Sequence, residues 1–307
     1  MLSYNEVSKS ARKFLAMTGY TVQEFQALLP HFRAQFEQYV ATTRLDGKPR
    51  TQREYTDYQN SPLPTIADKQ LFILVYLKQG TIQTAQGALF GMHQSDANRW
   101  IHLLHPLLNQ ALATLGELPA RDALEWNEKV TPPGTYFHDG VERAIVRPRD
   151  PEDQQTYYSG KKKQHTIKNI LVVDAASKVR FLSATGEGKK HDKKAADEAG
   201  YQLPAGSTLY QDTGFQGFTL PGVAVQQPMK KPRGRELTPE EKAINRHISR
   251  IRIRVEHAIS GVKRFRIVKD EIRNWKEGFR DEVMETCCGL HNFRLNFRPW
   301  HYETPVT

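Results

Sequence analysis

The sequence is poor in the features of secreted and membrane proteins. Its 307 residues include only 2 cysteines, Cys287 and Cys288, and adjacent thiols provide neither a useful disulfide nor a zinc site of recognisable spacing. No apolar run approaches the roughly 18 residues of a membrane-spanning helix, because the longest candidate, residues 71–77, is a short helix core. The N-terminus lacks the apolar stretch of a secretory signal. We therefore expect a cytoplasmic protein without a membrane partner.

Positive charge is concentrated in the C-terminal half of the chain. The sequence carries 44 Lys and Arg against 34 Asp and Glu, and residues 229–273 alone contain 14 basic and 6 acidic side chains. Such an excess favours a polyanionic partner, and nucleic acid fits better than an acidic membrane because no basic amphipathic anchor accompanies it. A solvated charge run is the alternative for the three lysines at 161–163 taken alone.

The first third of the chain carries helical patterns. Thr21 and Glu24 form a capping box ahead of apolar residues at helical spacing, which predicts a helical segment within residues 1–42. Residues 43–65 are polar and rich in Pro, Gly and Asn, so we interpret them as a linker.

Three short helices separated by glycine turns are predicted between residues 66 and 116. The first is capped by Asp68 and ends before Gly80, the second spans residues 82–90, and the third starts near Gln94. This arrangement is typical of a helix-turn-helix, whose last helix presents its polar first turn to the major groove of DNA. A generic helical subdomain is the alternative for this segment taken alone. The candidate base-contacting residues are Gln94, Ser95, Asn98 and Arg99.

β-Strand patterns replace the helical ones after residue 130. Helical runs interrupt the strands, one near residues 190–199, with Asp192 as its cap, and a long one from about Thr238 to Phe265. This order indicates an α/β domain with a mixed sheet flanked by helices. The predicted strands cover residues 135–141, 144–148, 165–173, 178–184 and 207–210.

Two acids lie at the ends of predicted strands. Asp139 falls within or at the end of the first strand, where a buried carboxylate costs free energy unless a cation such as a divalent metal neutralises it. On local sequence alone, a strand-end acid that accepts hydrogen bonds from a turn at Gly140 explains this residue better. Asp212 follows the strand at 207–210, at the edge where α/β folds bind ligands. The two acids are candidates for one site on neighbouring strands.

A third acid, Glu256, lies on the long helix beside its apolar stripe. At about 100° per residue, Arg252, Glu256 and Lys263 share one face of this helix. A lone acid among basic side chains belongs either to a salt-bridge cluster or to a metal site beside phosphate-binding groups.

Further basic side chains lie just before this helix and along it. A loop rich in Gly and Pro carries Lys230, Lys231, Arg233 and Arg235, which indicates a segment that contacts DNA phosphates, with a solvated loop as the alternative. The helix itself carries a row of arginines four residues apart, Arg246, Arg250 and Arg254. A basic ridge of this length repels itself without counter-ions, so it favours DNA as the partner.

Four sequence motifs resemble those of a known family. They are HDG around Asp139, GKKHD at 188–192, YQDTGFQG around Asp212 and RIRVEHAISGVKRFRIV around Glu256. Over roughly residues 66–298, the chain resembles the DDE transposases of bacterial insertion sequences, in the group related to PIF/Harbinger transposases. Members often carry Tyr, Arg, Glu and Lys on the last helix. Arg252, Glu256 and Lys263 fit that spacing, and Ser249 stands where the Tyr would be.

The resemblance implies an α/β fold with an RNase H-like mixed-sheet catalytic core over residues 131–300, preceded by an all-helical N-terminal region with a helix-turn-helix domain at 66–116. It also implies that Asp139, Asp212 and Glu256 are catalytic residues that hold two Mg²⁺ or Mn²⁺ ions, since hard cations take oxygen ligands. Arg252 and Lys263 would neutralise phosphates near the scissile bond.

The function implied is that of a DNA transposase that binds the ends of its insertion element and catalyses Mg²⁺-dependent strand cleavage and strand transfer. Its partners would be the terminal inverted repeats, the target DNA and further copies of the chain, as a homodimer or higher homo-oligomer on nucleoid DNA. A domesticated DNA-binding regulator and a metal-dependent nuclease without strand transfer are the alternatives.

Overall fold

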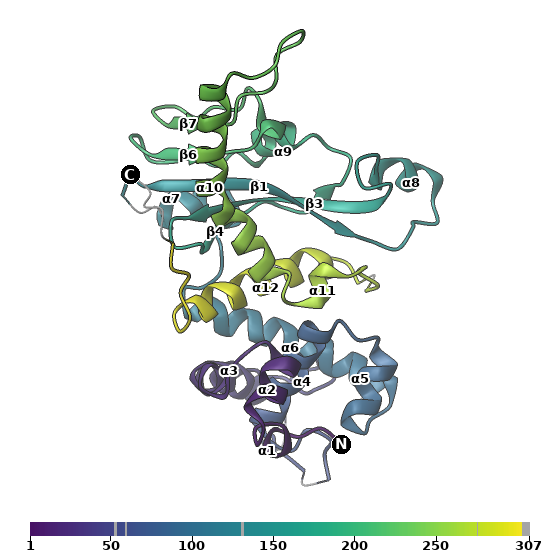
Figure 1. Ribbon diagram of the computed structural model, residues 1–307. Coiled ribbons are helices and arrows are strands. Elements are labelled where there is room, and N and C mark those ends of the chain that lie inside the picture. The colour runs from purple at the N-terminus through teal and green to yellow at the C-terminus, as the bar shows by residue number, and fades with distance from the viewer. Residues whose placement is uncertain (52–53, 59, 130–131, 275, 303–307) are drawn as a thin grey trace. The chain divides into compact units, whose positions relative to one another are not determined.

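A computed structural model describes residues 1–302 of the chain apart from 52–53, 59, 130–131 and 275. The chain divides into two compact units, each built from two stretches of sequence (Figure 1). Unit 1 comprises residues 1–118 and 263–297, and unit 2 comprises residues 119–262 and the segment from Arg298. Parts of the predicted linker (52–53 and 59) and the expected first residue of the catalytic domain (131) lie outside the described residues.

Unit 1 is helical. The capping box of Thr21 and Glu24 forms as predicted at the start of α3, and Pro30 lies inside that helix without dividing it. The helices of the unit are α1 (Tyr4–Val7), α2 (Ala11–Thr18), α3 (Val22–Thr42), α4 (Ile66–Gln79), α5 (Gln83–Phe90), α6 (Gln94–Thr114), α11 (Arg266–Lys269) and α12 (Phe279–Leu295).

The C-terminal helix α12 is part of this helical unit. Its residues are buried on nearly every side, and it packs against α6, while α11 packs against α4. The Tyr20 hydroxyl donates a hydrogen bond to the Leu290 carbonyl at 2.7 Å, across 270 residues of sequence. The domains expected from the sequence assign residues 263–300 to the catalytic domain, whereas this compact unit includes 263–297. Local patterns do not indicate which distant helices will cover an apolar helix such as α12.

Helices α4, α5 and α6 form the expected helix-turn-helix. Gly80 and Gly91 end α4 and α5 with φ of 61° and 68°, a left-handed conformation that favours glycine. A Cβ on Gly87 of α5 would lie 2.6 Å from a carbonyl oxygen of the following turn, so the turn needs glycine there as well. The predicted cap at Asp68 is wrong. Thr65 is the N-cap of α4, and Asp68 completes a capping box three residues later, because both residue types can cap and Thr65 comes first.

Unit 2 contains a mixed sheet. Its order is β2-β3-β1-β6-β7, with β4 and β5 also paired to β3. The pairs β1–β3 and β3–β4 are antiparallel, and the pairs β1–β6 and β6–β7 are parallel. An antiparallel meander followed by two parallel strands confirms the expected RNase H-like core. The strands are β1 (Thr135–Ala144), β2 (Tyr158–Ser159), β3 (Gln164–Asp174), β4 (Val179–Leu182), β5 (Gly186–Glu187), β6 (Thr208–Tyr210) and β7 (Ala224–Gln226).

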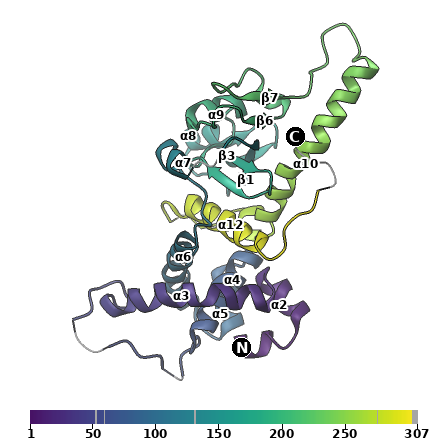
Figure 2. The same cartoon turned by 90° about the vertical axis from the view of Figure 1, so that its left-hand side faces the viewer.

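Helices cover both faces of this sheet (Figure 2). The short 3₁₀ helix η1 (Thr213–Phe215) and α9 (Asp192–Ala199) contact each other on one face, where His138 of β1 stacks on Phe215. The long helix α10 (Pro239–Val262) lies on the other face, where its Arg254 stands over the ring of Phe137. Because side chains alternate along a strand, neighbouring residues of β1 serve the two faces in turn. Unit 2 also contains α7 (Ala123–Lys129) and α8 (Pro151–Tyr157).

The predicted strand at residues 144–148 is wrong. Strand β1 continues to Ala144, and the chain then enters α8. Asp150 caps α8 by accepting hydrogen bonds from the backbone N–H groups of Glu152 and Asp153, with Pro151 in the first turn. An Asp-Pro pair before a polar run is a helix start, so the sequence contained this signal.

Candidate active site

Asp139 lies on β1, and Asp212 follows the neighbouring parallel strand β6 as the N-cap residue of η1. The β1–β6 register pairs Phe137 with Tyr210, whose rings stack with centroids 5.4 Å apart. Asp139 lies two residues beyond Phe137 on β1, and Asp212 lies two residues beyond Tyr210, just past the end of β6. The two acids are close enough for the charge of Asp212 to raise the pKa of Asp139. The pair therefore follows from strand register, as the sequence predicts.

Glycine N–H groups hold both carboxylates. The Gly140 N–H donates to Asp139 Oδ1 at 2.7 Å, and the Gly214 N–H donates to Asp212 Oδ1 at 2.6 Å. The first bond is the one that the local sequence at Gly140 favours. Each carboxylate keeps a second oxygen, and neither acid forms an ion pair with any residue that the structure describes.

The residues that precede the two acids join the strands on the opposite face. His138 Nε2 and Gln211 Oε1 lie 2.9 Å apart, and His138 Nδ1 contacts the hydroxyl of Tyr201. Burial lowers the pKa of His138 to about 3, so the ring is neutral and donates from Nε2 to the Gln211 oxygen. This pair fixes the register at the level of the acids.

Burial is the main cause of the raised pKa of Asp139, and neighbouring negative charge adds to it. Burial, together with the charges of Asp212 and Asp192, raises the pKa of Asp139 to about 6, against the lowering effect of the Gly140 N–H group and Arg252. Arg252 is buried, and its Nε has no hydrogen-bond partner among the described residues. A cation at the two acids would relieve this repulsion.

Glu256 stands apart from the pair. It lies on α10 one turn beyond Arg252, its side chain is exposed, and no hydrogen bond or ion pair joins it to another described residue. Within the described part of the chain, no group of three or more His, Cys, Asp and Glu side chains could hold a metal ion. The structure brings together Asp139, Asp212 and Arg252, and does not bring Glu256 to them.

The donor atoms of the pair fit a hard divalent cation. They are carboxylate oxygens, and each carboxylate accepts one backbone hydrogen bond. Burial, with a further contribution from the charge of Asp212, raises the pKa of Asp139. Mg²⁺ and Mn²⁺ prefer such oxygen ligands. Two carboxylates leave room for substrate and water oxygens in an octahedral shell.

Asp192 has a different place from the predicted one. It does not cap α9, because His191 is the N-cap residue and makes no side-chain cap hydrogen bond. The Asp192 carboxylate instead accepts from Lys168 Nζ at 2.7 Å and lies close to Gly140 and Gly214. Sequence reasoning singled out this acid within the motif GKKHD at 188–192 but assigned it to the helix cap, so its ion pair with Lys168 and its closeness to the two glycines were not predicted.

A groove of about 410 Å³ lies next to Gly214. Three lysines line it, Lys193 and Lys194 of α9 and Lys230 of the basic loop, and Asp197 is the acid among its lining residues. Phosphate groups of a DNA strand fit such a lining.

The other predicted DNA contacts of unit 2 differ in availability. Lys230 and Arg233 are exposed, whereas Lys231 pairs with Glu236 and Arg235 forms two bonds with Glu241 at 2.6 and 2.7 Å. On α10, Arg246 and Arg250 are exposed.

Arg254 is not available as a DNA contact. It is buried, donates to the Ala175 carbonyl at 3.2 Å and stacks on the ring of Tyr302 at 4.3 Å. Its row position on α10 predicted exposure, but the helix turns this arginine toward the sheet. The guanidinium of Arg254 therefore packs α10 against the rest of unit 2.

The predicted contacts of the helix-turn-helix lie on its surface. Gln94, Ser95 and Arg99 of α6 are exposed and Asn98 is half-buried. Gln94 Nε2 donates to Gln83 Oε1 at 2.6 Å, and Arg99 pairs with Asp96. Lys263 begins the second stretch of unit 1, so it belongs to a different compact unit from Glu256.

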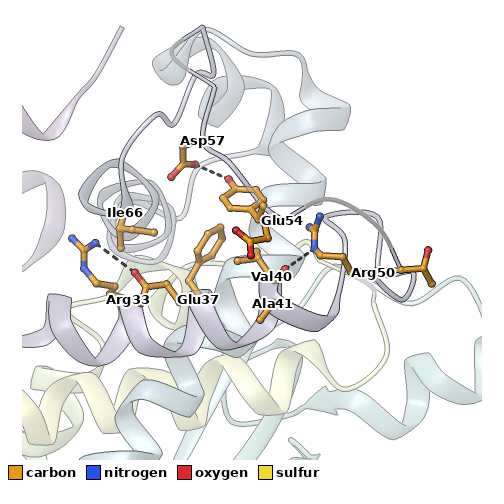
Figure 3. A pocket seen from close by; sticks show the side chains of 11 residues that line it. Arg33, Glu37, Val40, Ala41, Arg50, Glu54, Asp57 and Ile66 are labelled. Carbon is orange, nitrogen blue, oxygen red and sulfur yellow. Dashed lines mark hydrogen bonds and ion pairs between the residues drawn. The ribbon is translucent and has the colours of Figure 1, made fainter.

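A separate cavity of about 700 Å³ lies in unit 1 (Figure 3). It is bounded by α3 and the segment after it, with Arg33 paired to Glu37 at 3.6 Å and Tyr55 donating to Asp57 at 2.6 Å. None of the candidate acids of unit 2 lines it, so it is not part of the site described above.

Comparison with family models identifies the fold family. Residues 138–292 match the model of the DDE superfamily endonucleases, and residues 61–114 match the model of the helix-turn-helix of DDE superfamily endonucleases. The chain belongs to the DDE superfamily endonucleases. The endonuclease match begins at the residue before Asp139 and includes Asp212 and Glu256, and the second match covers α4 to α6.

Relatives of this DDE endonuclease carry transposase names. It is 26% identical over 288 residues, 93% of this chain and 95% of the relative, to a protein of Microchaete diplosiphon named as a transposase for insertion sequence element IS702. It is 25% identical over 210 residues, 67% and 72% of the two chains, to a protein of Streptomyces albus G named as a transposase for element IS112. No solved structure matches it. None of the helices in the described part of the chain has the length and apolar character that a membrane crossing requires.

Proposed function

We propose that this DDE endonuclease is a DNA transposase that binds the ends of its own insertion element and catalyses strand cleavage and strand transfer. The observation that carries the proposal is the Asp139–Asp212 pair, in which Asp139 is half-buried on β1 and Asp212 follows the parallel neighbour β6, each carboxylate accepting one glycine N–H bond. The matched helix-turn-helix and the transposase names of both relatives support it.

Asp139 and Asp212 would hold Mg²⁺ or Mn²⁺, two ions per site, and Glu256 would complete the ligand set. When bound there, such ions stabilise the attacking and leaving oxygens of an in-line displacement at phosphorus. Because Glu256 is exposed on α10, its arrival at the pair belongs to the DNA-bound state.

The remaining residues orient the DNA strand and balance its charge. Arg252 is buried near Asp139, and its Nε has no hydrogen-bond partner among the described residues, so it would donate to a phosphate beside the scissile bond. Lys193, Lys194 and Lys230 line the groove next to Gly214 and would hold the phosphates that follow. Water attacks first and releases a 3′-hydroxyl, and that hydroxyl then attacks the target strand. No covalent link to the protein is needed.

Recognition of the element ends belongs to unit 1. The first turn of α6, with Gln94, Ser95, Asn98 and Arg99, would read base edges in the major groove. An element has two ends and each needs its own helix-turn-helix, so we infer a homodimer or a higher homo-oligomer on DNA.

Incubation with DNA that carries the gene's flanking sequence tests this proposal. With Mg²⁺, a transposase gives 3′-hydroxyl ends and joined products. Cleavage without joining would indicate a nuclease, and binding without cleavage would indicate a DNA-binding regulator. Asp139→Asn and Asp212→Asn should bind these ends without cutting them.

A further inference from the structure

The carboxylate of Asp192 lies between the two glycines that hold the catalytic acids. A Cβ built on Gly140 would lie 2.8 Å from Asp192 Oδ1, and a Cβ built on Gly214 would lie 3.0 Å from Asp192 Oδ2. Real Cβ atoms do not approach oxygens this closely without displacing them. At Gly140 the space is occupied by Asp192, and at Gly214 it is shared by Asp192 and by Asp212 Oδ1, which would lie 2.8 Å from the added Cβ.

These two glycines are the donors to the acids. Their N–H groups bond to Asp139 Oδ1 and Asp212 Oδ1. Asp192 therefore lies beside Gly140 and Gly214, the same two residues whose N–H groups orient the carboxylates of Asp139 and Asp212.

Lys168 anchors Asp192 from the neighbouring strand. Its ammonium group is buried and lies 2.7 Å from Asp192 Oδ1, 2.6 Å from the Lys190 carbonyl and 3.5 Å from Glu142 Oε1. Glu142 of β1 stands directly opposite Lys168 of β3 in the sheet register. The lysine therefore ties the start of α9 to the same two strands that carry and support Asp139.

We propose that the Lys168–Asp192 ion pair is a positioning device that sets the spacing of Asp139 and Asp212 through Gly140 and Gly214. This inference rests on the proposed function. Asp192 acts through the glycines and is a positioning residue, separate from the acids that face the reaction. Substitution of a residue that orients metal ligands in this way lowers metal affinity or activity by about 10–100-fold.

The first test compares Asp192→Asn with Asp174→Asn. Asp174 is a matched control, because it also pairs with a cation at close range, Arg180 at 2.6 Å, and its side chain is 17% exposed against 20% for Asp192. Three quantities are measured: the melting temperature, the affinity of the DNA-free protein for Mn²⁺ by electron paramagnetic resonance, and the cleavage rate on bound end DNA. Asp192→Asn should lower Mn²⁺ affinity about tenfold and the rate at saturating DNA 10–100-fold, with DNA affinity unchanged. Asp174→Asn should keep both within about threefold of the wild-type values.

The second test uses a double-mutant cycle between Gly140→Ala and Asp192→Ala, which isolates the contact between the two residues. Gly140→Ala alone should cost 10-fold or more in cleavage rate, because its methyl group displaces Asp192. Added to Asp192→Ala, it should cost less than threefold, because the carboxylate that it displaces is gone. A fully additive double mutant would overturn the contact as the cause.

The failures of the two proposals are distinguishable. If Asp139→Asn and Asp212→Asn still cut DNA, or the wild-type protein binds no Mn²⁺, the proposed function fails. If those two variants are inactive while Asp192→Asn matches Asp174→Asn in metal affinity and rate, the positioning role alone is overturned.

Discussion

The sheet and the long helix of unit 2 carry their acids in opposite ways. Asp139 and Asp212 follow from strand register, each accepts a backbone N–H bond, and the His138–Gln211 pair ties their strands together. Glu256 sits on an exposed turn of α10 with no described partner. Without DNA, the fold therefore brings together two of the three expected catalytic acids, Asp139 and Asp212.

The difference indicates which part of the site needs DNA. Hydrogen bonds to neighbouring strands fix the backbone of a strand and so the direction in which its side chains point. A side chain on an exposed helix face is free to change its rotamer. We infer that the strand-borne pair is formed before DNA binds and that Glu256 joins it afterwards.

The largest effect is expected from removing charge on the strands. Asp139→Asn and Asp212→Asn should each lower the cleavage rate by about 10³-fold, because charge on the reacting oxygens is left unneutralised. Affinity for end DNA should be unchanged or higher, since a carboxylate that repels phosphate is gone. Gel assays of binding and cleavage check this pair of results. Glu187→Gln, an acid outside the set, is the control and should cut normally.

Glu256→Gln should also lower cleavage, by about 10²-fold, yet differ from the strand variants in metal binding. Without DNA, Mn²⁺ affinity should equal that of the wild-type protein, and with end DNA it should be lower. Titration of Mn²⁺ in both states checks this. An equal loss in the DNA-free state would show that the helix already belongs to the site before DNA binds.

The crowding at Asp139 predicts a pH-dependent stability. Its pKa is raised from 3.8 to about 6 in the folded protein, so the folded state binds the proton more tightly and stability falls as pH rises from about 4 to about 6. Without metal, Asp139→Asn should therefore be more stable than the wild-type protein by about 2–3 kcal/mol above pH 6, and equal to it below pH 4. Urea unfolding at pH 4 and 7.5 checks the sign. Added Mg²⁺ should stabilise the wild-type protein only.

A smaller effect separates the two DNA-contacting regions. Replacing Asn98 or Arg99 by Ala should lower the preference for element ends by about 1–3 kcal/mol per lost base contact and leave nonspecific binding nearly unchanged. Replacing Lys230 and Arg233 by Ala should weaken all DNA alike and reduce the salt slope by about 2. Binding curves at several salt concentrations check both. Equal weakening of all DNA by Asn98→Ala would remove the recognition role from α6.

Local sequence predicted the parts of this molecule that depend on local physics. The capping box at Thr21, the glycine turns of the helix-turn-helix and the position of Asp212 just past a strand are confirmed. Asp139 lies in the middle of β1, because that strand continues to Ala144. These features depend on residues a few positions apart or on strand register. The N-cap of α4 is Thr65 and not the predicted Asp68, which is also a local effect because both residue types can cap and lie three positions apart.

Features set by distant contacts escaped prediction. The local sequence predicts Asp192 as a helix cap, whereas the structure pairs it with Lys168, 24 residues earlier in the chain. The spacing of arginines predicts Arg254 as part of a basic row that contacts DNA, whereas the structure buries it against the sheet. Glycines directly after Asp139 and two residues after Asp212 were visible signals of a close approach, but the sequence did not reveal which side chain approaches.

A structure of the chain bound to its element-end DNA, with Mg²⁺ or a non-reactive substitute such as Ca²⁺, tests the central claim most directly. We expect ions bound to Asp139 and Asp212 with β1 and β6 unchanged, and the Glu256 carboxylate moved to within ligand distance, about 2.0–2.6 Å. It would be contradicted by ions bound elsewhere, or by a Glu256 carboxylate that stays more than about 10 Å from both acids, because shared ions cannot bridge such a gap.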